Sequence, residues 1–390
     1  MTPRAHIDSP AGTELDKPHF HVYGWYMFSE SISEDAPVRI LLNDRDVPVS
    51  VYRRPDVEAA YPKAFSRGFS AFVWLSQYIE DGHLRLTVDV SGRRVADKQY
   101  AVKPEVTEIS AAQLRSKEFK RKWLLQKLRC PVCRSPLTAA PQEHIACSQC
   151  STAYATNEHC LDLIPPSFRN AREIQFQGNV CSHGYDRDVM EIVEDVRSRG
   201  GMLLDCGAGY RGSVDPNIVT TEITAYPTTD VLAANQVLPF QDAVFDAVLS
   251  LHVLEHVSDP FACAQELVRV TKPGGIIFAV TPMIVPEHGY PHHFFNPTIE
   301  GLKRLFASSK VERVFIPRMG HPVNGVRSIL DLYLHNLPEN VQKKFLRMSV
   351  SDLLAGSLEE CIEKEFAAQL SEEGRRRLAA NFALRVKKVD

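Results

Sequence analysis

The spacing of hydrophobic residues changes along the chain and divides it into regions. Before about residue 102, apolar and polar residues alternate in short runs such as residues 38–42 and 84–90. Alternation with a period of two is typical of strands that have one buried face. Residues 201–306 instead carry continuous apolar runs, glycine turns and helical spacing, which predicts buried parallel strands joined by helices. Beyond about residue 325 helical periodicity dominates.

Composition shifts place the boundaries between these regions. The start of the chain is polar and contains prolines, and Pro165-Pro166 marks the approach to the central region. The C-terminal helices would serve as a substrate lid or a dimer surface. We expect six segments: a disordered lead (1–17), an antiparallel β-sandwich accessory domain (18–104), a basic helical connector (105–129), a cysteine-containing module (130–166), an α/β core (170–325) and a helical C-terminal cap (326–390).

A glycine turn follows the first buried strand of the core. The apolar run ends at Asp205, and Gly207 and Gly209 come almost at once. Glycines allow a sharp turn and close approach of a ligand, and ligands of parallel sheets bind beyond the carboxyl ends of the strands. With Gly212 the spacing also matches a dinucleotide fingerprint. The segment between Gly212 and the next apolar run is too short for a pyrophosphate-binding helix, so a ligand without phosphates is favoured.

Further motifs extend this pattern toward a known family. Glu222 closes the next apolar run, where a carboxylate can accept hydrogen bonds from both hydroxyls of a ribose. Together the segments LLDCGAGY, TTE, LPFQDAVFDAVLSLHVLEHVSDP and RVTKPGG resemble class I methyltransferases that use S-adenosylmethionine (SAM). The resemblance covers residues 200–310. It implies a Rossmann-like sheet of seven strands, with SAM across its carboxyl edge.

The same resemblance implies which residues contact SAM. Related sequences place an acidic residue a few positions before LPF, where it contacts the adenine amino group. Ala234 occupies that position here, so we expect the carbonyl oxygen of Asn235, or Asp230, to make the contact. The implied cofactor-binding residues are Asp205, Gly207, Ala208, Gly209, Glu222, Asn235, Leu238, Leu251 and His252.

Two CxxC pairs predict a metal site upstream of the core. Cys130 and Cys133 form one pair, and Cys147 and Cys150 form the other. Each pair presents two sulfurs together, and four thiolates suit a structural Zn²⁺ that stabilises a module too small for its own core. With the segment that follows them, they resemble the zinc ribbons found beside RNA and tRNA methyltransferases. A redox role is the weaker reading, and the remaining cysteines are expected to be packed thiols.

The connector before the cysteines is rich in lysine and arginine. Phe119, Trp123, Leu124 and Leu128 could form one apolar stripe along a helix there. Two readings remain open. In the favoured interpretation the apolar stripe packs on a domain and the charged side chains remain solvated. In the other, the connector is a basic patch that binds RNA or an acidic substrate.

Histidines are the candidate general bases for methyl transfer to a hydroxyl. His252 and His256 are four apart, which would place them on one helix face after the strand that ends at Leu251. His288 and His293 lie in PEHGYPHHFFNPT, a loop in which related enzymes build the acceptor pocket. We take His256, His293 and His288 as catalytic candidates. A metal in this loop is disfavoured, because Glu287 is its one nearby acidic partner in the sequence.

Charge and targeting features limit the functional classes. The net charge is −3, which gives no general drive toward nucleic acid or membranes. We expect a cytoplasmic protein, because no signal peptide and no membrane span is read. The favoured function is SAM-dependent methylation, on oxygen or nitrogen, of a small molecule, glycan or nucleotide-sugar. A homodimer is one oligomeric state that the sequence allows. The alternatives are an RNA methyltransferase and a degenerate scaffold that retains the fold.

Overall fold

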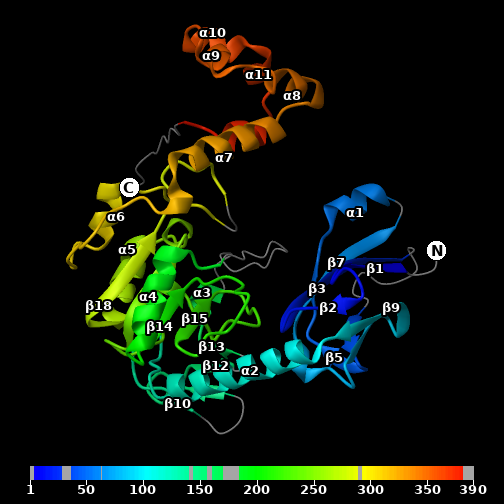
Figure 1. Ribbon diagram of the computed structural model, residues 1–390, viewed down its shortest axis with the longest axis vertical. Helices are drawn as coiled ribbons and strands as arrows, with labels where there is room; N and C mark the ends of the chain where they lie inside the picture. Colours follow the sequence, from blue (N-terminus) through cyan, green and yellow to red (C-terminus); the bar gives the residue numbers. More distant parts are fainter. Residues whose placement is uncertain are drawn as a thin grey trace, which may run out of the picture. The chain divides into compact units, whose positions relative to one another are not determined.

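The computed structural model describes residues 4–28, 37–62, 64–139, 144–155, 160–169, 184–288 and 292–380 (Figure 1). The chain forms two compact units. The first comprises Met1–Leu251 with Glu266–Phe278, and the second comprises His252–Gln265 with Ala279–Asp390.

The N-terminal part of the first unit consists of two sheets that share one hydrophobic core. Pairing is antiparallel except between β2 and β9, and both sheets contribute side chains to that core. In spatial order, the first sheet is β1 (Arg4–Ser9), β3 (His19–Phe28), β7 (Phe65–Trp74) and β6 (Ser50–Tyr52), with α1 (Pro55–Ala60) and the 3₁₀ turn η1 (Leu75–Gln77) at its ends. The second is β2 (Glu14–Leu15), β9 (Arg93–Val102), β8 (His83–Val90), β4 (Val38–Leu42) and β5 (Arg45–Val47).

The disordered lead expected at residues 1–17 is wrong for the part that the structure describes. β1 pairs with β3 from Arg4 opposite Met27, and β2 pairs with β9. These strands lie at sheet edges, where polar side chains are tolerated because one side of the strand faces solvent. Their polar composition therefore concealed strands that only pairing with distant segments stabilises.

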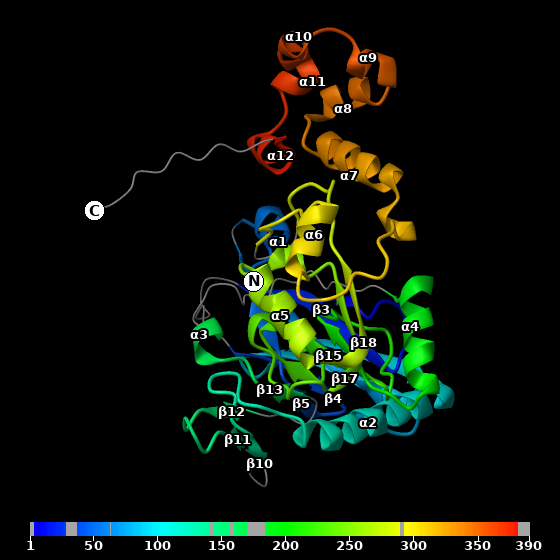
Figure 2. The same cartoon turned by 90° about the vertical axis from the view of Figure 1, so that its left-hand side faces the viewer.

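A long helix links the sandwich to the rest of the first unit. α2 spans Pro104–Leu125, close to the predicted connector. The predicted stripe is only partly correct: Leu124 and Leu128 are buried, whereas Phe119 is 56% exposed. In Figures 1 and 2 the small sheet of β10 (Thr138–Ala139), β11 (His144–Ala146) and β12 (Ala153–Ala155) lies near the C-terminal end of α2.

The central sheet has six strands in the described residues. Its order is β13-β16-β15-β14-β17-β18, and the pairs from β13 to β17 are parallel. α4 (Arg187–Ser198) packs Val189, Val193 and Val196 against this sheet. The strands are β13 (Leu161–Asp162), β14 (Leu203–Cys206), β15 (Ile218–Glu222), β16 (Val231–Leu232), β17 (Phe245–Leu251) and β18 (Thr271–Val280). The segments between them contain α3 (Pro166–Arg169), the 3₁₀ turns η2 (Asn235–Val237) and η3 (Leu254–His256), and α5 (Pro260–Val270).

The sheet departs from the seven strands that the resemblance implies. Residues 311–316, a run of strand-forming residues, have no regular structure, so the described chain supplies no strand beyond β18. Instead β13, from the end of the cysteine module, adds to the opposite edge. The helix that follows Pro297 is α6 (Ile299–Leu305), and the Thr298 side chain caps it by accepting from the Gly301 N–H.

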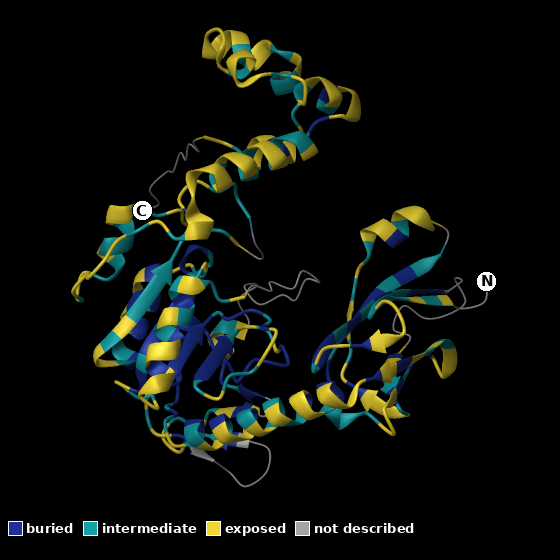
Figure 3. Cartoon of the chain, in the orientation of Figure 1, coloured by how far each residue is buried: buried dark blue, intermediate teal, exposed yellow. Residues whose placement is uncertain are grey.

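Helices dominate the second unit, as predicted for the C-terminal cap. Figure 3 shows mostly exposed or intermediate residues on α7 to α11, in contrast with the buried strands of the central sheet. Among the described residues, no helix combines the length and apolar character that crossing a bilayer requires. The helices are α7 (Pro322–His335), α8 (Glu339–Phe345), α9 (Val350–Leu354), α10 (Leu358–Glu363), α11 (Glu365–Ala368) and α12 (Glu372–Arg377), preceded by the 3₁₀ turn η4 (Arg318–Gly320).

Candidate functional site

The glycine turn lies at the carboxyl end of β14, as predicted. Gly207 and Gly209 have φ values of 71° and 65°, in the left-handed region that favours glycine. The N–H groups of Gly207 and Ala208 both donate to the carbonyl of Thr221, at 2.9 and 3.0 Å. The turn is therefore fixed against β15.

Asp205 is fully buried directly before this turn. Its Oδ2 accepts hydrogen bonds from the Tyr185 hydroxyl at 2.6 Å and from Arg211 Nη2 at 2.7 Å. The Arg211 guanidinium also lies 4.5 Å from the centre of the Tyr185 ring. The sequence did not predict either partner: Tyr185 is 20 residues from Asp205, and Arg211, although only six residues away, meets Asp205 only because the chain turns between them. Together they compensate a buried charge that would otherwise be costly.

Glu222 ends β15 beside the turn, also as predicted. Its Oε1 accepts from the Gly209 N–H at 3.0 Å, and its Oε2 accepts from the Ile223 N–H at 2.7 Å. Burial raises the pKa of this carboxyl, and the two backbone donors oppose that effect. The carboxylate thus links the glycine turn to the strand end where a ribose is expected.

Asn235 and Asp230, the two residues expected to replace the acidic adenine contact, differ in their partners. The residue is 8% exposed, and its Oδ1 has no hydrogen-bond partner among the described residues. The alternative, Asp230, is already committed: its Oδ2 accepts from Lys120 Nζ at 2.6 Å and from the Thr220 N–H at 3.0 Å. Asn235 is therefore the better candidate for an adenine contact.

The remaining predicted cofactor residues lie at neighbouring positions of the chain and the sheet. Leu238 is buried, and its carbonyl accepts from Arg134 and Arg269, each at 3.0 Å. Leu251 ends β17, next to β14 in the sheet. His252 follows with φ of 58°, so the chain turns at this residue rather than starting a helix.

The histidines gather in the second unit, but not on one helix face. His252 and His256 flank the 3₁₀ turn η3, so the shared helix face predicted for them is wrong. The ring centres of His256, His288 and His293 lie 4.4 to 5.5 Å apart. His293 Nδ1 accepts from the His288 N–H at 3.1 Å, and its Nε2 donates to Asn296 Oδ1 at 2.7 Å. Both nitrogens of His293 are thus engaged.

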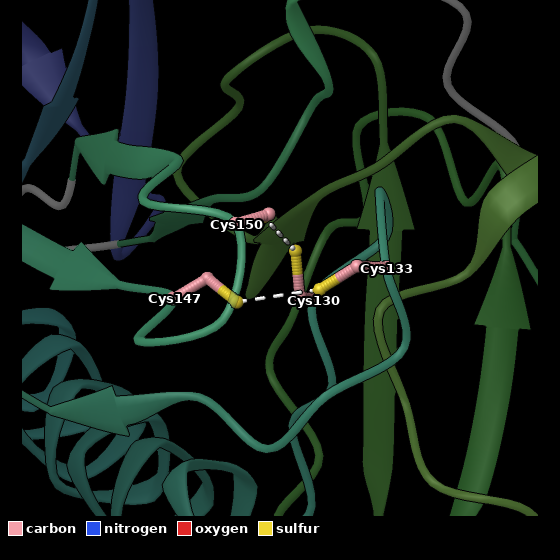
Figure 4. A group of neighbouring side chains, drawn as sticks. All are labelled: Cys130, Cys133, Cys147 and Cys150. Atoms are coloured by element: carbon pink, nitrogen blue, oxygen red, sulfur yellow. Dashed lines mark hydrogen bonds between the residues drawn. The ribbon is translucent and has the colours of Figure 1, made fainter.

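The four cysteines converge (Figure 4). The sulfur atoms of Cys130 and Cys150 are 3.6 Å apart, and those of Cys133 and Cys147 are 3.4 Å apart. Four sulfurs at about 2.3 Å from Zn²⁺ in a tetrahedron lie roughly 3.8 Å from one another, so the arrangement fits this ion. All four ligand atoms lie within 4.8 Å of one another.

The two cysteine turns have the same backbone geometry. Arg134 N–H donates to the Cys130 carbonyl at 2.8 Å, and Ser151 N–H donates to the Cys147 carbonyl at 2.9 Å. Arg134 and Ser151 both have positive φ, 65° and 58°. The Thr152 hydroxyl helps to lower the pKa of Cys150 to about 6, which favours the thiolate form that binds metals.

The basic connector uses two of its lysines internally. Lys117 Nζ donates to the carbonyls of Pro227 and Thr229, at 2.7 and 2.5 Å, and Lys120 pairs with Asp230. Burial lowers the pKa of Lys117 to about 8, although Asp230 opposes the shift. These two cations therefore serve the contact between α2 and the central sheet. The connector packs on a domain as expected, but the expectation that its charges are solvated is wrong for Lys117 and Lys120.

Aromatic side chains connect the sandwich with the glycine turn. His19 Nδ1 lies 2.5 Å from the hydroxyl of Tyr210, the residue that follows Gly209. The Phe72 ring lies 5.4 Å from that of Tyr210 and 5.3 Å from that of Tyr226. Phe72 belongs to β7, and its ring stacks on His21 of the neighbouring strand β3. Two further half-buried rings follow on β3, those of Tyr23 and Trp25, and Trp25 stacks on His6. We call His6, His21, Tyr23, Trp25 and Phe72 the aromatic row.

Comparisons with known proteins agree with this geometry. Residues 214–279 match the family described as methyltransferase domain. A stretch of 115 residues is 32% identical to an uncharacterized methyltransferase of Mycobacteroides abscessus, covering 29% of this chain and 38% of that protein. A stretch of 123 residues is 32% identical to an uncharacterized methyltransferase of Mycobacterium tuberculosis, covering 30% of this chain and 45% of that protein. A stretch of 121 residues is 32% identical to an uncharacterized methyltransferase of Mycobacterium marinum, covering 30% of this chain and 44% of that protein.

The parallel strands, the glycine turn after β14 and the acidic end of β15 agree with the arrangement that the resemblance to class I methyltransferases implies. The chain therefore contains a segment, residues 214–279, that is similar to a methyltransferase domain. It spans less than half the length of the curated relatives that it matches.

Proposed function

We propose that the protein transfers a methyl group from SAM to an oxygen or nitrogen of a glycan, nucleotide-sugar or other small molecule. The observation that carries the SAM part is the set of groups at the carboxyl edge of the sheet. Glu222 at the end of β15 supports a ribose contact, Asn235 Oδ1 is buried without a hydrogen-bond partner among the described residues and could accept from the adenine amino group, and the positive φ values of Gly207 and Gly209 support a tight ligand-binding turn.

SAM supplies a methyl group that is already activated on a sulfonium, so the protein mainly has to align and shield the reacting groups. The acceptor atom forms the new bond to carbon as the bond to sulfur breaks, and the acceptor proton must leave. His256 and His288 are the proposed bases. Their Nδ1 atoms lie 2.8 and 3.0 Å from the carbonyls of His292 and Pro286, and a carbonyl can only accept. Nδ1 therefore carries the proton, and Nε2 keeps the lone pair that a base needs.

His293 becomes the weaker catalytic candidate, because both of its nitrogens are engaged. It holds the loop instead, through Asn296, whose Nδ2 in turn donates to the Val285 carbonyl at 3.1 Å. Burial lowers the pKa of His288, which keeps this residue neutral at pH 7. His288 is accordingly the better second candidate.

The aromatic row supports the proposed class of acceptor. Flat rings bind the apolar faces of sugars and nucleobases, and Trp25, Tyr23 and His21 present three of them on one strand. Phe72 connects them to Tyr210, directly after the glycine turn. A bound sugar or base on the row would thus extend toward the turn.

We also propose that Cys130, Cys133, Cys147 and Cys150 bind a structural Zn²⁺. A closed Cys₄ site has no position for a substrate, so its effect is on folding. Arg134, in the first cysteine turn, donates to Glu266 at 2.9 Å and to the Leu238 carbonyl. The ion would therefore hold Arg134 against the segment that follows Asn235. Thiolates also fit the reducing cytoplasm in which we expect the protein.

Calorimetry with SAM tests the first part of the proposal. Saturable binding that Gly207→Val abolishes supports it, whereas no heat of binding at millimolar SAM would leave a scaffold role. Methyl transfer from labelled SAM to nucleotide-sugars and, in parallel, to total RNA then tests the acceptor. Label in RNA that decreases steeply with salt would favour the RNA alternative.

A further inference from the structure

Glu255 is the most unusual charged residue of the second unit. Its side chain is fully buried, and neither carboxylate oxygen has a hydrogen-bond partner among the described residues. An unpaired buried carboxylate is costly, so a cation is expected beside it. The nearest charged candidates are His252 Nδ1 and His256 Nε2, at 3.7 and 4.0 Å from Oε1, too far for hydrogen bonds.

Two imidazoles are held toward this carboxylate. A ring nitrogen of His256, one of His288 and a Glu255 oxygen all lie within 4.8 Å of one another. The loop that carries the second imidazole is attached to the same residue, because Phe294 N–H donates to the Glu255 carbonyl at 2.7 Å. The three groups therefore come together through backbone contacts.

The hydrogen bonds of the rings are those of metal ligands. In protein metal sites, a ligating histidine usually donates its other N–H to a carbonyl or a carboxylate, which fixes the tautomer. His256 donates Nδ1–H to the His292 carbonyl, and His288 donates Nδ1–H to the Pro286 carbonyl. Both rings thus keep the Nε2 lone pair for a ligand. His293 braces this arrangement by accepting the His288 N–H.

We propose that Glu255, His256 and His288 bind one divalent transition-metal ion. Bonds of about 2.1 Å place neighbouring ligand atoms roughly 3 to 3.5 Å apart, so the groups need to approach by about an ångström. Two imidazoles and one carboxylate suit Zn²⁺ or Mn²⁺, whereas Mg²⁺ and Ca²⁺ prefer oxygen ligands. The sequence disfavoured a metal because Glu287 was its one local acidic residue, but Glu287 pairs with Arg376 and Glu255 takes its place.

Three protein ligands leave positions open for water or for an oxygen of the acceptor. Resting on the proposed methyl transfer, the ion would bind the acceptor hydroxyl and lower its pKa, so that solvent water takes the proton, and the oxygen would attack the methyl carbon as the bond from that carbon to sulfur breaks. His256 and His288 would then act as ligands, and a separate protein base would not be required.

Mn²⁺ titration of the full-length protein, followed by electron paramagnetic resonance, tests the site. Thiolates are poor ligands for Mn²⁺, so the four cysteines should not contribute to the measured Mn²⁺ binding. We expect about one bound Mn²⁺ per chain, and at least a tenfold weaker affinity in Glu255→Gln and in His288→Gln. His335→Gln is the matched control, since His335 is exposed on α7 and should leave the affinity unchanged.

Two outcomes would overturn the site: no saturable binding of Mn²⁺ or of Zn²⁺ beyond the cysteine-bound ion, or binding that both variants retain. Thermal unfolding adds a check on folding, because Mn²⁺ should raise the Tm of the wild type but not that of Glu255→Gln. Calorimetry with SAM on the same samples separates the two proposals. SAM binding without metal binding would refute the metal site alone, and metal binding without SAM binding would refute the proposed function alone.

Discussion

Lys120 of α2 places its Nζ 2.6 Å from Asp230 Oδ2, and both side chains are almost completely buried. Lys117 lies on the other carboxylate oxygen, at 3.7 Å. One aspartate thus compensates two cations, and the helix that connects the sandwich is fixed to the edge of the central sheet. The basic connector is, at these positions, a structural element of the unit that contains the central sheet.

Replacing Asp230 should destabilise the first unit strongly. Asp230→Asn keeps the shape but leaves two buried ammonium groups without a counter-charge, which costs about 3 to 5 kcal/mol. Denaturant unfolding at pH 7 measures the change. Lys122→Met, on the exposed face of the same helix, should change stability by less than about 0.5 kcal/mol. Equal stabilities of the two variants would contradict the role assigned to the pair.

Removing one cysteine ligand should release the proposed zinc. We expect Cys133→Ser to reduce the metal content from about one zinc per chain to near zero and to lower stability by several kcal/mol, on the order of a structural zinc site. Metal analysis and thermal unfolding measure both effects. Cys361→Ser, a thiol outside the cluster, is the control. A wild-type protein without zinc would remove the basis of the prediction.

Asn235→Leu should weaken SAM binding about tenfold, since one hydrogen bond to a buried acceptor is worth roughly 1 to 1.5 kcal/mol. Leucine is similar in size and lacks only the polar group. Calorimetry measures the affinity, and unfolding without SAM shows whether the fold is retained. Unchanged affinity in a folded variant would mean that the adenine amino group binds elsewhere.

Acid should weaken the first unit through His19. Burial, with a smaller contribution from the Lys117 charge, lowers the pKa of His19 from 6.5 to about 4. The unfolded state therefore binds a proton before the folded state does, and stability is lost as the pH falls from about 6.5 to about 4. Between pH 7 and pH 5 the expected loss from this residue is about 2 kcal/mol.

Denaturant unfolding of the wild type and of His19→Gln, at both pH values, isolates this contribution. The variant should lose less stability than the wild type, by the amount given above. His83→Gln is the control, because His83 is exposed. Identical pH dependence in the wild type and in His19→Gln would show that His19 is protonated alike in the folded and unfolded states.

The aromatic row gives a prediction about the acceptor. Loss of one stacking ring, in Trp25→Ala, should reduce kcat/KM for a sugar-containing acceptor by roughly tenfold, since ring contacts of this kind contribute on the order of 1 kcal/mol. SAM affinity should not change, because Trp25 belongs to β3 of the sandwich, whose strands hold none of the candidate cofactor residues. Equal losses for Trp25→Ala and Val51→Ala, an exposed apolar residue on β6, would contradict a specific role for the row.

Local patterns in the sequence were sufficient for the elements whose residues are close together. The alternation of the sandwich strands, α2, the paired cysteines and the turn from Asp205 to Gly209 were all predictable, because spacing alone determines which face is buried or which ligands meet. Failures came where another segment decides the structure. β1 forms by pairing with β3, and the described residues give residues 311–316 no partner strand. His252 has a left-handed backbone conformation, so the helix expected to start there does not form.

The sequence by itself predicted a core that resembles methyltransferases, four cysteines with the spacing of a metal site and a β-rich accessory region. Only the tertiary structure decided how charges are compensated. It paired Asp205 with Arg211 and Tyr185, Asp230 with Lys120, and left Glu255 facing His256 and His288. The physical reason is that hydrophobic periodicity depends on neighbours within a few residues, whereas a buried charge selects partners by distance in space.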